Sequence, residues 1–415
     1  MRIPSLPIEI VGEITSHLRA PLQGDTKEAI EAGQALSLVC RGWSPIGQAL
    51  RWKDLQIDVT AVPSLLAHFD LYTHLPQLVT KFTQLGLSDD QVETSESHSS
   101  SEVDEEAFEP LPKLLQTLDQ LRVLDLRSVH STFEPVLRAA AGMTGLQIFS
   151  LTTKRPVEWN NDVDSVFAAG FPSLRQFIVT LTAAVVHEAD IGHHSGAHRC
   201  KRLEDVSLSW FQSEANILVH SILSTMDLAA LRTLFLGGVP ANTFPFGSLS
   251  SCPNLRSLKI LVSESSVASN FPAILSNLDK ATSLEILEYT VLPKTTSYPS
   301  PLTLDALFAS FPSTLRLLQA PQILLTTSDL SQNWPLASPP PADGLCVVQG
   351  LIATSEGTRC VLFWRERGSK EKRGYQCILE YTSWDEFKAR YADHLSHKAE
   401  EAHSVSRLCR TSGST

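Results

Sequence analysis

The sequence lacks the features of a secreted or membrane protein. Met1 and Arg2 are followed at once by Pro4, Pro7 and Glu9, without the apolar segment of a signal peptide. No uncharged apolar run approaches the roughly 20 residues that a membrane-spanning helix needs. Asn-x-Ser/Thr acceptor sites are absent, and the seven cysteines include no Cys-x-x-Cys pair. These absences predict a reducing environment, cytoplasmic or nuclear, with thiols that are not bridged.

Basic residues are also scarce, with 34 Lys and Arg against 45 Asp and Glu and a formal net charge of −11. This balance gives no support to nucleic-acid binding. The Gly-rich and Ser-containing motifs of nucleotide-binding proteins and hydrolases are missing as well. We therefore expect a non-catalytic protein without a cofactor.

The chain begins with a short helical region at residues 1–58. Leu6, Ile10, Ile14 and Leu18 recur every four residues, which predicts an amphipathic helix. A capping box at Asp25 predicts a second helix that contains residues 30–40. Ser44 followed by a proline predicts a third helix, flanked by Trp43 and Trp52. From the residues alone, this region is either a docking module or a helical cap for the rest of the chain.

Three strings in this region resemble the F-box motif: LPIEIVGEI, SLVCRGW and, nine residues after Trp43, Trp52 with Leu55. The resemblance covers about residues 4–57. It departs from the family in about ten extra residues between Leu18 and Leu36, and in Arg51, where the family usually has Leu. It implies a module that docks on the Skp-type adaptor of a cullin–RING ubiquitin ligase. Carried over by position, the adaptor-binding residues are Leu6, Pro7, Ile10, Ile14, Leu36, Val39, Cys40, Trp43 and Trp52.

Downstream, the pattern Leu-x-x-apolar-x-apolar occurs eight times, and its three specified positions are apolar in every copy. The intervals between first positions average about 28 residues, within the usual period of leucine-rich repeats. The eight frames are Leu121/Leu124/Leu126, Leu146/Phe149/Leu151, Leu174/Phe177/Val179, Leu203/Val206/Leu208, Leu231/Leu234/Leu236, Leu255/Leu258/Ile260, Leu284/Leu287/Tyr289 and Leu315/Leu318/Ala320.

The repeats resemble an irregular leucine-rich-repeat solenoid over residues 59–334, without the usual Asn after the third apolar position. Each repeat is expected to place a short strand beside its neighbours, because one repeat cannot bury its own apolar face. Residues 55–57 and 82–85 are candidates for the first strands, and residues 216–226 and 304–308 are expected to be helical. The alternative is an ordinary α/β domain, for which strand spacing should vary more. The expected fold class is α/β.

Two polar segments interrupt the array. Residues 88–109 are acidic and Ser-rich, and we expect them to be disordered. They are either a solvated surface loop or a phosphorylated segment with Ser99 and Ser101 as the candidate sites. The second segment holds His187, His193, His194, His198 and Cys200. Its spacing does not match a closed zinc site, so a polar loop is favoured over a metal site.

After a proline-rich stretch, residues 343–395 predict a small α+β element. Three strand-like runs, 346–353, 359–365 and 375–381, are expected to pair antiparallel, and Ser383 begins a helix. This element either caps the last repeat or forms a separate module. Residues 396–415 are expected to be a polar tail.

Together these observations predict a substrate-recognition subunit of a cullin–RING ligase, with a leucine-rich-repeat scaffold outside ubiquitination as the alternative. The expected partners are a Skp-type adaptor, through it a cullin, and an unknown protein substrate. Arg stands after the first Leu in five of eight repeats, which is either a basic stripe for an acidic partner or a solvated face. The candidate substrate-binding residues are Arg122, Asp125, Arg175, Arg232, Phe235, Arg256, Lys259 and Glu288.

Overall fold

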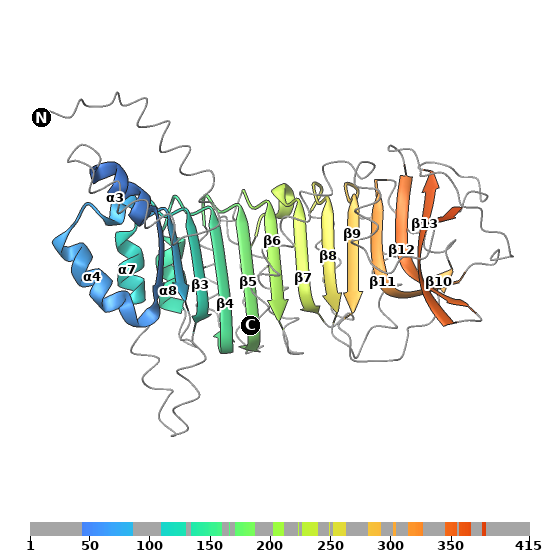
Figure 1. Cartoon of the computed structure of the whole chain (residues 1–415), viewed down its shortest axis with the longest axis horizontal. Coiled ribbons are helices and arrows are strands. Elements are labelled where there is room, and N and C mark those ends of the chain that lie inside the picture. Colours follow the sequence, from blue (N-terminus) through green and yellow to red (C-terminus); the bar gives the residue numbers. More distant parts are fainter. Residues whose placement is uncertain are drawn as a thin grey trace, which may run out of the picture. The chain divides into compact units, whose positions relative to one another are not determined.

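The computed structural model describes residues 44–85, 109–129, 134–159, 166, 171–186, 202–210, 223, 226–239, 249, 252–262, 281–291, 302–303, 314–326, 345–354, 357–366 and 376–378. The chain divides into two compact units, residues 1–200 and 201–415. Within each unit, parallel strands pair in chain order (Figure 1). The two helices predicted before residue 44, nearly all of the acidic segment, the histidine-rich segment, the helix at Ser383 and the tail lie outside the described residues.

Unit 1 is a parallel sheet in the order β1-β2-β3-β4-β5. Helix α7 packs against α8 and contacts α4, so the helices between successive strands lie beside one another (Figure 1). The elements are α3 Ser44–Lys53, β1 Asp54–Asp58, η2 Val59–Ala61, α4 Val62–Leu71, η3 Pro76–Leu78, β2 Lys81–Leu85, α7 Leu111–Thr117, β3 Val123–Val129, α8 Glu134–Ala141, β4 Ile148–Trp159 and β5 Gln176–Val186. None of the described helices is long and apolar enough to cross a membrane.

Unit 2 continues the same design, with β6, β7, β8, β9, β11 and β12 parallel and β12, β13 and β14 antiparallel. The short strand β10 pairs with β11. The elements are β6 Asp205–Trp210, η6 Leu228–Ala230, β7 Thr233–Val239, β8 Ser257–Val262, β9 Ile286–Val291, β10 Leu302–Thr303, β11 Leu317–Thr326, β12 Leu345–Thr354, β13 Gly357–Glu366 and β14 Gln376–Ile378.

The predicted repeat frames form the core. Of the 24 apolar positions, 23 have a described burial, and each of these is at most 2% exposed. The strands pair in the same frame, so that Leu124, Phe149 and Phe177 lie opposite one another across β3, β4 and β5. We call these inward positions the buried ladder. Successive repeats bury one another's apolar faces, as the periodicity predicts.

A hydrogen-bonded turn precedes most of the described parallel strands. The N–H of the first ladder residue donates to the carbonyl three residues earlier, as in Leu121 to Leu118, Leu174 to Phe171 and Leu255 to Cys252. Those earlier residues are themselves buried. The repeat therefore has a fourth apolar position, which anchors the turn that leads into the strand.

Both candidate first strands are confirmed. Leu55 of β1 lies opposite Phe82 of β2, which lies opposite Leu124 of β3. Val79 is fully buried and takes the first ladder position of the β2 repeat, and Trp52 takes that of the β1 repeat by the same spacing. The predicted helix at Ser44 is also confirmed, although α3 runs past Trp52 to Lys53. Strand β1 thus falls within residues 1–58, the range of the F-box-like region, and yet it pairs with β2 as part of the repeat sheet.

The three C-terminal strands pair antiparallel as predicted, and the described part of the third is β14 at Gln376–Ile378. Strand β12 also pairs in parallel with β11. These strands therefore extend the repeat sheet of unit 2. Of the predicted helices at 216–226 and 304–308, only Leu223, which is helical and buried, and Met226 are described.

Candidate functional site

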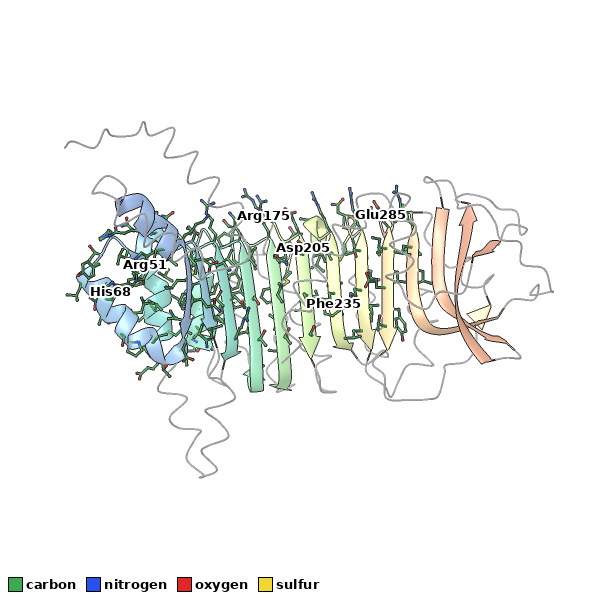
Figure 2. All side chains as sticks on the ribbon, in the orientation of Figure 1. Arg51, His68, Arg175, Asp205, Phe235 and Glu285 are labelled. Atoms are coloured by element: carbon green, nitrogen blue, oxygen red, sulfur yellow. The ribbon has the colours of Figure 1, made fainter. Side chains whose placement is uncertain are left out.

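Each repeat exposes one residue just before its strand, directly after the first ladder position. We call these residues the pre-strand column. Within each unit, the carbonyl of every such residue except the last accepts the N–H of its counterpart in the next repeat. Examples are the N–H of Gln147 to Arg122 and that of Arg175 to Gln147, both at 2.8 Å. Figure 2 shows Arg175 and Glu285 at the edge of the sheet where the strands begin. The column is Lys53, Thr80, Arg122, Gln147 and Arg175 in unit 1, and Glu204, Arg232, Arg256, Glu285 and Arg316 in unit 2.

In unit 2 the pre-strand column is mixed in charge. A guanidinium nitrogen of Arg232 lies 3.8 Å from Glu204, and Arg256 and Arg316 each lie 4.0 Å from Glu285. The predicted arginines at 232 and 256 therefore face carboxylates of neighbouring repeats. These long, partly exposed pairs contribute little stability, but the two glutamates offset most of the charge of the three arginines in the column of unit 2.

In unit 1 the same column contains no acid. Lys53, Arg122 and Arg175 are exposed, and none of them forms an ion pair with another described residue. Two acids on the neighbouring strands have partners of their own: Asp54 lies 2.7 Å from Lys81, and Asp125 lies 2.9 Å from Arg127. Sequence reasoning missed Lys53, although the spacing of Trp52 and Leu55 already matched the repeat frame.

The other predicted residues lie on the polar face, which we define as the strand positions that alternate with the buried ladder. Phe235, Lys259 and Glu288 occupy the same position of β7, β8 and β9 and are neighbours in register. The Lys259 ammonium lies 5.7 Å from the centre of the Phe235 ring and 2.9 Å from a carboxylate oxygen of Glu288. The structure thus brings three of the predicted substrate-binding residues into one row. Asp125 lies in unit 1 and pairs with Arg127 instead.

The aromatic end of this row depends on small neighbours. A Cβ placed on Gly237 would lie 2.8 Å from the Ser209 hydroxyl and 3.2 Å from the Phe235 ring. The ring therefore lies along β7 against the bare backbone of Gly237. The next residue, Gly238, has a φ of 78°, which favours glycine. The bare backbone of Gly237 thus leaves the space that the Phe235 ring occupies on β7 (Figure 2 labels Phe235).

Asp205 on β6 is a further polar group on the same face, next to Thr233 in register. Burial raises the pKa of its carboxyl, and the charge of Glu204 adds to that effect. A hydrogen bond from the Thr233 side chain and the charge of Arg232 act in the opposite direction. Asp205, Phe235, Lys259 and Glu288 together therefore place one cation, one aromatic ring and two carboxyl groups on the polar face of unit 2.

Of the predicted adaptor-binding residues, only Trp52 lies among the described residues. Its ring stacks on His68 at 5.6 Å, with an interplanar angle of 18°, and contacts Phe69 at 5.7 Å. The Arg51 guanidinium lies 5.7 Å from its centre (Figure 2 labels Arg51 and His68). Trp52 is half-buried, and it ties α3 to α4. The adaptor-binding residues before position 44 lie outside the described residues.

Within the described residues, no group of three or more His, Cys, Asp and Glu side chains is arranged to hold a metal ion. The five residues of the histidine-rich segment fall outside that part of the chain. Comparison of the sequence with models of known protein families gives no match, and comparison with curated proteins gives none either.

Proposed function

We propose that the chain is the substrate-recognition subunit of a cullin–RING ubiquitin ligase of the Skp–cullin–F-box type. The observation that carries the proposal is the direct passage from the F-box-like strings into the repeat sheet. Helix α3 ends at Lys53 and β1 begins at Asp54. Trp52 is part of the F-box-like strings and also takes the first ladder position of the β1 repeat. A substrate receptor needs an adaptor-docking motif and a substrate-binding surface in one chain.

The junction supports the proposal because it is packed. Trp52 stacks on α4, and the neighbouring β1 pairs with β2 along its whole length. A stiff junction holds the bound partner at a set distance from the adaptor. In a ligase the receptor contributes proximity, since it raises the effective concentration of a substrate near the ubiquitin carrier, and catalysis belongs to other subunits.

The test is co-purification of the full chain with a Skp-type adaptor. The double variant Leu6→Ala/Pro7→Ala should lose the adaptor, because these residues lead the F-box-like string. The matched control is Pro63→Ala/Leu71→Ala, which removes the same side-chain types from exposed positions of α4. Adaptor retained by the first variant, or lost equally from both, counts against the proposal.

The alternative is a leucine-rich-repeat scaffold outside ubiquitination, which the repeat sheet supports equally well. It predicts that the unmodified chain recovers no adaptor. It also predicts that Leu6→Ala/Pro7→Ala changes only the thermal stability of the array, because residues 1–43 would then serve as a cap.

A further inference from the structure

We propose that the pre-strand column of unit 1 binds an extended acidic segment of a partner protein, with a carboxylate at every third residue. This inference rests on the proposed function in one respect: the acidic segment would belong to the protein that the receptor presents. The surface consists of Lys53, Arg122 and Arg175, with Thr80 and Gln147 between them.

Charge distinguishes this column from its counterpart in unit 2. Three exposed cations stand in it without an acid, whereas the column of unit 2 alternates arginines with Glu204 and Glu285 at 3.8 to 4.0 Å. Even Asp119, three residues ahead of Arg122, forms no ion pair with it. The two columns share one backbone pattern, so their difference in charge is a difference in what they can bind.

The spacing of the cations suits an extended chain. They belong to the repeats of β1, β3 and β5, so each is two strands from the next. Neighbouring strands lie roughly 4.8 Å apart, which separates the cations by about 10 Å. A polyproline II chain advances about 9 Å in each turn of three residues, and residues three apart lie on the same side. A carboxylate at every third residue therefore meets every cation.

The two residues between the cations have different roles. The Thr80 hydroxyl donates to the Lys53 carbonyl at 3.2 Å and helps to hold that end of the column. Gln147 is half-exposed between Arg122 and Arg175. A polyproline II backbone has no internal hydrogen bonds, so its carbonyls can accept from such an amide. The column thus offers three cations, with one amide between two of them that can bind the backbone of the segment.

Carboxylates fit better than phosphates. Each phosphate carries close to two negative charges at neutral pH and is best held by clustered arginines. Here the cations stand singly. Nucleic acid is disfavoured by the formal net charge of −11, and a membrane surface would need an apolar anchor beside the charges.

The experiment measures binding of fluorescent peptides to the full chain by anisotropy. The probe carries three glutamates, each separated by two prolines, and its comparison peptide has the same composition with the glutamates adjacent. Arg122→Gln/Arg175→Gln should weaken binding of the spaced peptide roughly tenfold. The matched control Arg232→Gln/Arg256→Gln, from the ion-paired column, should change it less than about twofold. The spaced peptide should bind better than the clustered one.

Three results would overturn the inference: equal losses in the two double variants, equal binding of the two peptides, or tighter binding of a phosphoserine version than of the glutamate peptide. Adaptor co-purification separates this inference from the proposed function. Arg122→Gln/Arg175→Gln should keep the adaptor, and Leu6→Ala/Pro7→Ala should keep the peptide. Unchanged melting temperatures of the arginine variants show that the fold is intact.

Discussion

Lys259 and Glu288 form a cross-strand ion pair on the polar face of unit 2, with 2.9 Å between the ammonium nitrogen and a carboxylate oxygen. Their side chains are 28% and 11% exposed. Lys81 and Asp54 form the corresponding pair in unit 1 at 2.7 Å, with exposures of 43% and 32%. Both pairs join neighbouring strands in register. They differ in solvent exposure and in the Phe235 ring, which lies 5.7 Å from the Lys259 ammonium.

A double-mutant cycle on each pair should therefore give unequal coupling. For Lys259→Met and Glu288→Gln we expect about 1 to 2 kcal/mol, because the pair is shielded from water and one carboxylate loses its partner in the single variant. For Lys81→Met and Asp54→Asn we expect about 0.5 kcal/mol. Urea denaturation of the native protein, the two single variants and the double variant of each cycle provides the measurement. Equal coupling in both cycles contradicts the role assigned to burial.

Gly237 should tolerate substitution poorly. In Gly237→Ala the added methyl group lies 2.8 Å from the Ser209 hydroxyl and 3.2 Å from the Phe235 ring. Displacing these groups should cost about 1 to 3 kcal/mol of stability. Gly142→Ala is the matched control, because its methyl group would meet only carbonyl oxygens, the nearer at 3.4 Å, and it should be neutral or stabilising. Melting temperatures decide between them. A Gly237→Ala protein as stable as the control would show that the ring is not fixed by the glycine.

Sequence reasoning found the buried ladder because the ladder is local and repeated. Leu124, Leu126 and their counterparts keep the same spacing in every repeat, and stacking of the repeats then buries them. The polar residues were harder to interpret. Whether Arg256 is free or faces Glu285 depends on which residue the next strand places beside it. The repeat frames already place Glu204 and Glu285 at the position of the arginines, but the distances of 3.8 to 4.0 Å between these side chains come only from the structure.

A polar residue, Gln84, occupies one position of the buried ladder, where the repeat pattern predicts an apolar residue. Gln84 is fully buried on β2, between Ile57 of β1 and Leu126 of β3. Its amide nitrogen donates to the Leu85 carbonyl, while its amide oxygen has no hydrogen-bond partner among the described residues. A buried polar atom without a partner lowers stability.

Gln84→Leu should therefore stabilise the protein by about 1 kcal/mol, since it removes that oxygen at nearly constant volume. The midpoint of urea unfolding should rise without a change in slope. Gln147→Leu, on the half-exposed pre-strand column, should leave the midpoint nearly unchanged. A lower midpoint for Gln84→Leu would mean that the amide contributes more through its one bond than its oxygen costs.

Cys252 should make stability depend on pH in the alkaline range. It sits in the turn before β8, where it is 1% exposed, and burial raises the pKa of its thiol from 9.0 to about 11. The folded chain thus keeps a proton that the unfolded chain releases. Its stabilising effect is complete below about pH 9 and is lost as pH rises toward 11.

Replacing the thiol by Cys252→Val should therefore flatten the pH profile. Between pH 9 and 10.5 the native protein should lose about 1.5 kcal/mol more than the variant. Urea unfolding at both pH values measures this difference. The Tyr289 phenol, whose pKa burial also raises, is present in both proteins and cancels in the comparison. Parallel profiles for the two proteins would show that Cys252 ionises as readily in the folded chain as in the unfolded one.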